Sequence, residues 1–444
     1  MIESPYDIFN VFSNAEFPYP QIMMSDGQSV KLHQSAFSLY RAAPHREDRK
    51  KVFASFFGKL GEFHRTFGTQ LAASVHAHLF TMRARNHTSC LESTLDTNNI
   101  PVAVYRRLIE GVQEHLPTFH RYLELRKRML QVGELHYYDL YAPLVRSVDV
   151  TYSIEEAQEL VLKSIEPLGA EYSKTIRRVF DERWIDAFPT EGKRSGAYSN
   201  AAAYDVHPYI LLNFNGTYDD VSTLAHELGH TMHGYFSNKT QPYPTSRYAI
   251  FVAEVASTFN EALLNDYMLT TITDDAARLS VLGNYLENLK ATVFRQTQFA
   301  EFELIIHELA ERGEALTGET LNEQYMNITK KYYGHDEGVC CIDDEIKFEW
   351  TYIPHFYYNF YVFQYATSYT ASALLSELVL QGDKAAVKRY MEFLSCGGSD
   401  YPIELLKKAE VDLTTSQPLE FTISKMNRVM DEMERILTVI SIES

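Results

Sequence analysis

Apolar residues recur at steps of three and four positions along most of this chain. The pattern is clearest in five segments, at residues 48–85, 101–131, 153–182, 275–313 and 319–333. Such spacing places apolar side chains on one face of an α-helix, where a core can cover them. The third segment opens with Ser153 and a first turn rich in glutamate, which is typical of a helix N-terminus. The chain is therefore predicted to be mainly α-helical.

The pattern changes near residue 190. Two short runs at 195–200 and 207–213 contain β-branched or aromatic residues and have turn-forming residues at their ends. Such runs are typical of β-strands. They come directly before a helical stretch that contains two closely spaced histidines, so we expect a small sheet beside that helix.

A second pair of extended runs lies within residues 10–33, around Ser25-Asp26-Gly27. A turn sequence between extended runs predicts a small β-hairpin. We therefore expect a mainly helical scaffold with an N-terminal hairpin at 1–190, and a second part with the sheet and further helices at 191–444. The two parts are predicted to form one compact unit.

The helical stretch at 223–233 reads TLAHELGHTMH and contains the pattern H-E-x-x-H in His226, Glu227 and His230. On a helix, His226 and His230 leave the same face one turn apart, so both imidazoles can bind one metal ion. Glu227 then points beside the metal. Residues 219–222 supply side chains that can cap the helix N-terminus. Because this short pattern also arises by chance, a metal site needs a third ligand.

Glu254 is the candidate third ligand. It lies 24 residues after His230, in the first turns of a predicted helix at 248–261. The loop between the two helices contains two prolines, which can turn the chain back. Two histidines and one glutamate leave one coordination position for water, which is the ligand set of a catalytic zinc site. The sequence therefore predicts one Zn2+ per chain, bound by His226, His230 and Glu254.

Two further histidines bear on this prediction. His233 shares the helix face of His226 and His230, but the step from His226 to His233 covers about 10.5 Å of helix rise, too far for a common set of ligands. We expect His233 to lie behind a ligand or to face the substrate. His307 and Glu308 lack a second histidine, and we expect them to be exposed surface residues.

The charge and the cysteines narrow the class of protein. A net charge of −18 argues against a nucleic-acid partner, because such partners require a basic surface. The N-terminal residues lack the pattern of a signal peptide, and no apolar run reaches the length of a membrane span. The four cysteines show no C-x-x-C spacing and are predicted to be reduced thiols. These features predict a cytoplasmic protein with neither nucleic acid nor membrane as a partner.

Three separate segments resemble one family. HELGHTMH, FVAEVASTFNE and, at 353–368, IPHFYYNFYVFQYATS are similar to the oligoendopeptidase F branch of the thimet-oligopeptidase family of zinc metallopeptidases. The similarity runs from SPYDIFNVFSNAEFP near the start to CGGSDYPIELLKKA near the end. Members of this branch usually carry a further helical segment before the point at which this chain begins. We therefore expect a short or N-terminally truncated form.

The resemblance implies a zincin-type (gluzincin) fold, mainly α, with a small β-sheet beside the H-E-x-x-H helix and a deep cleft between helical halves. It implies a zinc-dependent endopeptidase that hydrolyses internal peptide bonds of short oligopeptides. In such an enzyme zinc activates a water molecule, and Glu227 takes the proton of that water as general base. Glu261 lies seven residues after Glu254 on the same helix face, where we expect it to orient a zinc-bound imidazole.

The resemblance also implies residues that contact the substrate. An edge strand beside the zinc binds an extended peptide through its backbone. The strand residues are Gly196, Ala197, Tyr198 and Ser199. A histidine and a tyrosine donate hydrogen bonds to the oxyanion. His355 matches the histidine, and the tyrosine is left open among Tyr357, Tyr358, Tyr361 and Tyr365. Of these, Tyr358, Tyr361 and Tyr365 share one helical face by their spacing and are the favoured candidates.

Two other functions remain open from the sequence. An inactive homologue that only binds peptides would be indicated by a changed Glu227, but this glutamate is intact. A zinc carboxypeptidase or dipeptidase would use the same metal site and would need a charged anchor for a substrate terminus, a role for which no arginine can be assigned. Oligopeptides are the predicted partners in every case. The sequence decides neither for a monomer nor for a homo-oligomer.

Overall fold

The computed structural model describes residues 3–144 and 151–443. Contacts within the chain define two units, and each unit consists of three separate stretches. Unit 1 comprises Met1–Thr97, Ile109–Arg146 and Phe294–Phe363, and unit 2 comprises Asn98–Leu108, Ser147–Val293 and Gln364–Ser444. The predicted boundary at residue 190 lies within the longest stretch of unit 2.

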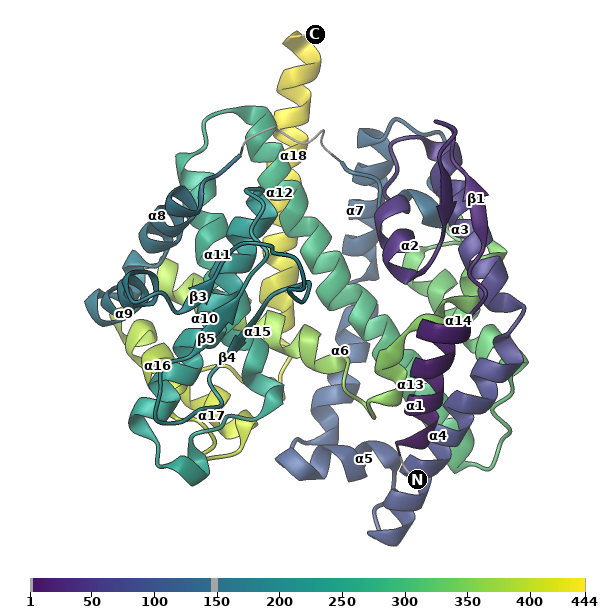
Figure 1. The fold of residues 1–444 in the computed structure, drawn as a ribbon, viewed down its shortest axis with the longest axis horizontal. Helices are drawn as coiled ribbons and strands as arrows, with labels where there is room; N and C mark the ends of the chain where they lie inside the picture. The colour runs from purple at the N-terminus through teal and green to yellow at the C-terminus, as the bar shows by residue number, and fades with distance from the viewer. Residues whose placement is uncertain (1–2, 145–150, 444) are drawn as a thin grey trace. The chain divides into compact units, whose positions relative to one another are not determined.

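Unit 1 is mainly helical, as the apolar spacing predicts (Figure 1). Its helices and strands are α1 (Ser4–Val11), β1 (Gln21–Met23), β2 (Ser29–Lys31), α2 (Gln34–Tyr40), α3 (Arg46–Gly61), α4 (His64–Ala84), α5 (Cys90–Leu95), α7 (Leu116–Met129), α13 (Arg295–Glu311) and α14 (Gly318–Tyr333). Short 3₁₀ segments are η3 (Tyr137–Asp139), η8 (Asp344–Tyr352) and η9 (Pro354–Tyr357). Aromatic rings fill its core: Phe37 stacks on Phe56 with ring centroids 4.0 Å apart, and Tyr352 packs edge-on against Phe56 at 5.4 Å.

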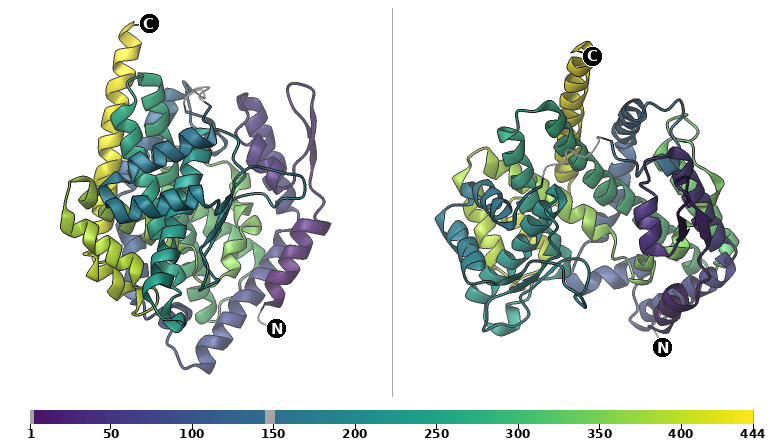
Figure 2. Two further views of the ribbon diagram at one scale, coloured as in Figure 1. Left: turned by 60° about the vertical axis from the view of Figure 1, so that its left-hand side comes forward. Right: turned by 45° about the horizontal axis from the view of Figure 1, so that its top comes forward.

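The predicted hairpin is confirmed. β1 and β2 pair antiparallel, with Ile22 opposite Val30. Gly27 in the turn has a φ of 85°, which glycine adopts without strain. Lys51 of α3 donates a hydrogen bond of 2.6 Å to the Met23 carbonyl and so holds the hairpin against α3. Figure 2 shows the ribbon of unit 1, in which the purple hairpin lies beside the helices that follow it.

Unit 2 contains a second group of helices. They are α8 (Ile154–Ser164), α9 (Ala170–Asp181), α10 (Tyr218–Thr240), α11 (Ala253–Thr271), α12 (Asp275–Leu289), α15 (Phe363–Leu380), α16 (Lys384–Ser395), α17 (Pro402–Lys408) and α18 (Gln417–Glu443). α6 (Val102–Glu114) contributes residues to both units. α10 packs against α11, and Leu224, Leu228, Val255 and Phe259 of these two helices are fully buried.

A three-stranded sheet packs beside α10 (Figure 1). The strand order is β3 (Ile185–Asp186), β5 (Tyr209–Leu211) and β4 (Tyr198–Asn200), with β5 parallel to β3 and antiparallel to β4. The strands predicted at 195–200 and 207–213 are therefore confirmed, although each is shorter than the run that predicts it. β3 has only two residues, too few to show a period of its own. β4 ends the order and is an edge strand.

Each of the three helical segments predicted in the first half forms two helices. The segment 48–85 is divided between α3 and α4, 101–131 between α6 and α7, and 153–182 between α8 and α9. Pro117 lies in the first turn of α7, and a 3₁₀ turn with Pro167 separates α8 from α9. Proline is tolerated in the first turn of a helix but interrupts a helix from within, so the chain breaks at these positions. The spacing of apolar residues continues across each break and therefore does not reveal it.

One prediction about α13 is wrong. His307 is fully buried rather than exposed. Its Nδ1 lies 2.7 Å from the Glu303 carbonyl, and its Nε2 lies 3.0 Å from Nδ1 of His78 in α4. The Glu303 carboxylate is buried as well and accepts a hydrogen bond of 2.6 Å from the Phe360 N–H. Polar side chains can be buried here because neighbouring segments supply hydrogen-bond partners, which the helix period does not show.

Glu303→Gln is expected to change how stability depends on pH. Burial raises the pKa of Glu303 from 4.5 to about 8, although the Phe360 N–H lowers it. The folded protein therefore holds one more proton than the unfolded chain between these values and loses stability as the pH rises through this window. Glutamine is neutral throughout, so the variant should gain stability relative to the parent between about pH 5 and 8, by up to about 1.4 kcal/mol per pH unit.

Urea unfolding at several pH values measures this difference. Glu319→Gln is the control, because Arg65 lowers the pKa of Glu319 to about 2. The stability difference between that control and the parent should stay constant over the same window. A constant difference for Glu303→Gln as well would contradict the prediction.

Candidate metal centre

The helix α10 begins well before its two histidines. Thr217 caps it: the Thr217 hydroxyl accepts a hydrogen bond from the Asp220 N–H, and the Asp220 carboxylate accepts one from the Thr217 N–H. This reciprocal pair is a capping box. Asp220 belongs to the run that the sequence predicts as capping, but the cap itself is Thr217. His226 and His230 therefore lie one turn apart in regular helix.

α10 and α11 approach each other closely at Gly229. A Cβ atom at this position would lie 2.3 Å from the Ala256 carbonyl oxygen of α11, so the approach requires glycine. The buried Asn260 of α11 donates a hydrogen bond of 3.2 Å to the Ala225 carbonyl and accepts one of 2.9 Å from the Tyr172 hydroxyl of α9. These contacts fix α11 beside the H-E-x-x-H turn of α10.

Three possible metal ligands converge between these helices. Nε2 of His226 lies 3.4 Å from Oε2 of Glu254, and Nε2 of His230 lies 3.5 Å from the same oxygen. One donor atom from each side chain lies within 4.8 Å of the others. Ligand atoms about 2.0–2.1 Å from a tetrahedral zinc ion are about 3.3 Å apart. Two imidazoles and a carboxylate at these separations fit zinc, with the fourth position left for water.

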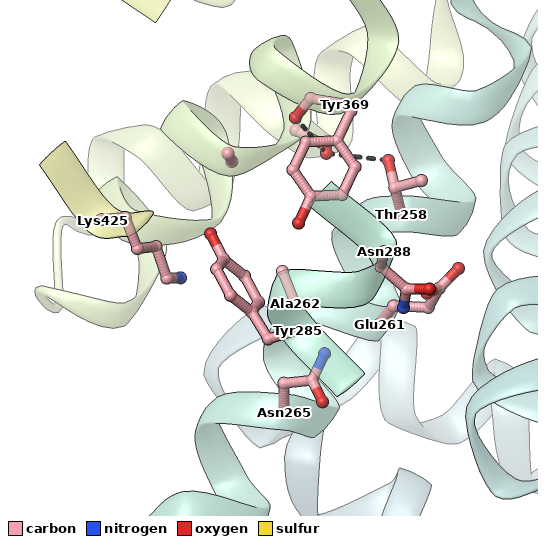
Figure 3. A pocket seen from close by; sticks show the side chains of 10 residues that line it. Thr258, Glu261, Ala262, Asn265, Tyr285, Asn288, Tyr369 and Lys425 are labelled. Atoms are coloured by element: carbon pink, nitrogen blue, oxygen red, sulfur yellow. Dashed lines mark hydrogen bonds between the residues drawn. The ribbon is translucent and has the colours of Figure 1, made fainter. Parts of the chain in front are cut away.

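Glu261 hydrogen-bonds the first histidine of the group. Its carboxylate contacts Nδ1 of His226, which leaves Nε2 directed toward Glu254. Burial lowers the pKa of His226, but the two carboxylates outweigh this effect and raise that pKa to about 10. They favour a cation at this position. Glu261 also lines a cavity of about 20 Å³ with Thr258 and Asn288, enough room for one water molecule (Figure 3).

Glu227 lies between the metal ligands and the edge strand. Its carboxylate accepts a hydrogen bond from the backbone N–H of Ser199 in β4, and its Oε2 is buried without a hydrogen-bond partner among the described residues. Burial raises the pKa of Glu227, although the neighbouring imidazoles lower it. A buried carboxylate oxygen without a partner is costly unless water or substrate completes its hydrogen bonding. Glu227 therefore has a free acceptor position at which a bound molecule can form a hydrogen bond.

The predicted substrate strand is only partly a strand. Tyr198 and Ser199 belong to β4, whereas Gly196 has a φ of 86° and Ala197 precedes the strand. Asn213 holds this turn by donating a hydrogen bond of 2.8 Å to the Gly196 carbonyl. Gly196 and Ala197 line a cavity of about 280 Å³ at the N-terminal turns of α10. The edge of β4 and this cavity can hold an extended backbone.

His233 does not lie where a substrate contact is expected. Its side chain is 1% exposed and stacks on Tyr248 with ring centroids 3.6 Å apart. Burial lowers the pKa of His233 to about 3, so its imidazole is neutral. His233 packs in the interior of unit 2, because Tyr248 and Phe393 cover the turn of α10 that follows His230. The prediction that His233 contacts the substrate is therefore wrong.

The segment 353–361, which contains His355, Tyr358 and Tyr361, belongs to unit 1. His355 lies in η9, and its ring centroid is 5.5 Å from that of Tyr358 and 6.3 Å from that of Tyr361. The backbone has a positive φ at Asn359 and Phe360. Such residues do not continue a right-handed helix, so the prediction that the three tyrosines share one helical face is wrong.

The three tyrosines are placed differently. Tyr365 lies in α15 and belongs to unit 2. The hydroxyl of Tyr358 lies 2.6 Å from the hydroxyl of Tyr6 in α1, a neighbour that the sequence does not indicate. Tyr358 and Tyr361 lie beside His355.

Comparison with known proteins identifies the family. The model of peptidase family M3 matches residues 39–424. The chain belongs to peptidase family M3. It is 43% identical over 437 residues to oligopeptidase PepF of Bacillus subtilis, and 38% identical over 427 residues to a chromosomal oligoendopeptidase F of Lactococcus lactis subsp. cremoris. These alignments cover 98% and 96% of this chain.

Comparison with solved structures agrees with this result. The structure of a putative peptidase from Chlamydophila abortus matches with a TM-score of 0.91 and 38% identity, and oligoendopeptidase-F from Enterococcus faecium matches with a TM-score of 0.80 and 35% identity. Each match covers 98% of this chain and 72% of the other chain. The chain spans 65% of the length of Bacillus subtilis PepF. The predicted resemblance to oligoendopeptidase F and the mainly α fold with small sheets are confirmed.

Some features of this M3 chain could not be found by motif. Asn260, which connects three helices, is a polar residue among the mainly apolar residues that α11 buries, and that contrast was the only signal. The backbone contact from Ser199 to Glu227 leaves no mark in the residue types. Among the described residues, no helix is both long and apolar enough to cross a bilayer.

Proposed function

We propose that this M3 chain is a zinc-dependent endopeptidase that hydrolyses internal peptide bonds of short oligopeptides. The observation that carries the proposal is the group of His226, His230 and Glu254 with Glu227 beside it, its Oε2 buried and unpartnered among the described residues. The relatives named oligopeptidase and oligoendopeptidase F support the substrate class. The four cysteines are free, which is typical of the cytoplasm, and we place the enzyme there.

One zinc ion per chain would be held by His226, His230 and Glu254. When bound, zinc lowers the pKa of a coordinated water molecule and polarises the scissile carbonyl. Glu227 takes a proton at its carboxylate from the attacking water and gives it to the leaving amine. Glu261 keeps the His226 ring in the orientation that directs Nε2 toward the metal.

The substrate would bind as an extended strand along β4. The backbone of an edge strand offers hydrogen bonds to any peptide, and the cavity beside Gly196 and Ala197 accommodates a side chain. Ser199 contributes a second effect, because its N–H holds the Glu227 carboxylate. The strand that binds the peptide therefore also positions the general base.

His355 is proposed to stabilise the oxyanion together with a tyrosine, on the basis of the motif in which it lies. Replacement of His355 by alanine, or of Tyr358, Tyr361 or Tyr365 by phenylalanine one at a time, should lower kcat without changing the zinc content. For His355 and at least one tyrosine we expect a loss of about a hundredfold. Steady-state kinetics and metal analysis of each variant measure this, and full activity in all three tyrosine variants would show that these rings only pack.

Digestion of peptides of graded length tests the proposed function. A folded protein cannot lay one strand along β4 without local unfolding, so oligopeptides should be cleaved at internal bonds while a stable globular domain is left intact. Mass spectrometry of the products distinguishes internal cleavage from removal of terminal residues. A chelator should abolish the activity and zinc should restore it. Release of terminal residues alone would indicate a carboxypeptidase or dipeptidase, and cleavage of the folded domain would indicate a general proteinase.

A further inference from the structure

A second group of possible metal donors lies in unit 1. It consists of Glu134, His136 and Cys341, whose donor atoms all lie within 4.8 Å of one another. None of these residues belongs to the three motifs or to the proposed catalytic groups. We propose that Glu134, His136 and Cys341 form a second metal site that binds zinc or a similar divalent cation. Thiolate, imidazole and carboxylate together are a donor set that zinc accepts.

Backbone pairing brings the donors together. His136 and Cys341 form a parallel β-bridge. The Tyr137 N–H donates a hydrogen bond of 3.1 Å to the Cys341 carbonyl, and the Cys341 N–H donates one of 2.7 Å to the Leu135 carbonyl. Bridged residues lie side by side. Glu134 reaches the same place, because its Oε2 lies 3.2 Å from Nε2 of His136.

His136 has the surroundings of a metal-binding histidine. Its Nδ1 lies 3.0 Å from Oδ1 of Asp343, and its ring stacks on Tyr138 with centroids 4.8 Å apart. A carboxylate on one ring nitrogen fixes the orientation of the ring and leaves the other nitrogen for a metal. That other nitrogen, Nε2, lies 3.2 Å from Oε2 of Glu134, close to the separation of about 3.3 Å between two ligands of one tetrahedral zinc ion.

The metal centre of unit 2 has the same arrangement. There Glu261 contacts Nδ1 of His226, and Nε2 faces Glu254 at 3.4 Å. An ion pair alone would account for a histidine between two carboxylates. An ion pair would not account for the position of Cys341, because a thiol adds nothing to such a pair. As a metal ligand, by contrast, the Cys341 sulfur completes a set of three donors.

The second site would be open and exchangeable. The side chain of Glu134 is 71% exposed and that of His136 is 18% exposed, so water completes the coordination. Binding would connect residues 134–136 with residues 341–343, two parts of unit 1 that lie far apart in the sequence. Because the folded form alone brings these donors together, the metal would stabilise unit 1, and this stabilisation would grow with the logarithm of the free metal concentration.

Cobalt(II) distinguishes the two sites. The donors of unit 2 contain no sulfur, so a sulfur-to-cobalt charge-transfer band in the near ultraviolet reports only on Cys341. We expect this band when Co2+ is added to the metal-free protein with its thiols kept reduced by a phosphine. The double variant His226→Ala/His230→Ala should still show it, which separates this proposal from the proposed peptidase function.

Variants at the second site decide the assignment. Cys341→Ser and His136→Gln should abolish the band, and Asp343→Ala should weaken cobalt binding about 10–100-fold. Cys396→Ser is the matched control, because Cys396 is also a half-buried free thiol but belongs to no donor group in the described part of the chain. Its band should be unchanged. Absence of the band in the parent protein, or its persistence in Cys341→Ser, would overturn the proposal.

Discussion

Glu227→Gln is expected to lower kcat by about a hundred- to ten-thousandfold while the zinc content stays at the parent level. Glutamine has the shape of glutamate and can still accept the Ser199 N–H, so the structure around it should not change. The amide cannot take the proton of the attacking water. Because the three metal donors are untouched, the loss should appear in turnover and not in metal binding.

Glu261→Gln serves as the comparison for this variant. Glu261 contacts Nδ1 of His226 rather than the reacting water, so its replacement should weaken zinc binding about 10–100-fold. Its activity should return when zinc is added in excess, whereas that of Glu227→Gln should not. Metal analysis and peptide hydrolysis at two zinc concentrations separate the two behaviours. If Glu227→Gln keeps its activity within a factor of ten of the parent, Glu227 is not the general base.

Gly229→Ala should destabilise the protein and reduce zinc binding together. The added methyl group would lie 2.3 Å from the Ala256 carbonyl and 2.6 Å from Cα of Ser257, so α10 and α11 must separate. Backbone cannot rotate away as a side chain can, and overpacking of this kind costs about 1–3 kcal/mol or more. Glu254 would move away from the two histidines with α11. Thermal unfolding and metal analysis measure both effects.

Gly283→Ala is the matched control. Gly283 is also a buried glycine within a helix, in α12, but a Cβ atom added there would meet no neighbouring atom within 4 Å. Alanine favours a helix over glycine by about 1 kcal/mol, so this variant should be as stable as the parent or more stable. Equal behaviour of the two variants would show that the close approach at Gly229 does not matter. Normal zinc content in an unstable Gly229→Ala would separate stability from metal geometry.

The grouping of His226, His230 and Glu254 could be predicted because its information is local. His226 and His230 need only a regular helix to share a face, and Glu254 needs only a second helix that returns to the first. The strands at β4 and β5 also follow from short runs of residues between turns. Each of these patterns lies in a short segment whose helix or strand conformation depends little on the rest of the chain.

The errors have a different origin. The positive φ values at Asn359 and Phe360 stop the helix that the spacing of the tyrosines suggests, and neither residue type demands such a conformation. His307 is buried because His78 lies against it, a contact between residues far apart in the chain. In both cases the conformation depends on contacts with distant parts of the chain. At Phe360, one such contact is the hydrogen bond that its N–H donates to the Glu303 carboxylate. The spacing of residue types in a single sequence does not reveal which distant residues will be in contact.

The interleaving of the two units has a consequence for synthesis on the ribosome. The first stretch of unit 1 ends at Thr97, but its third stretch starts only at Phe294. Phe37 and Phe56 pack against Tyr352, so their rings have no such cover until the nascent chain has passed that residue. A growing chain with uncovered aromatic rings is prone to aggregate. The order of translation therefore leaves these aromatic rings without their Tyr352 contact, and so open to aggregation, until the third stretch of unit 1 has been made.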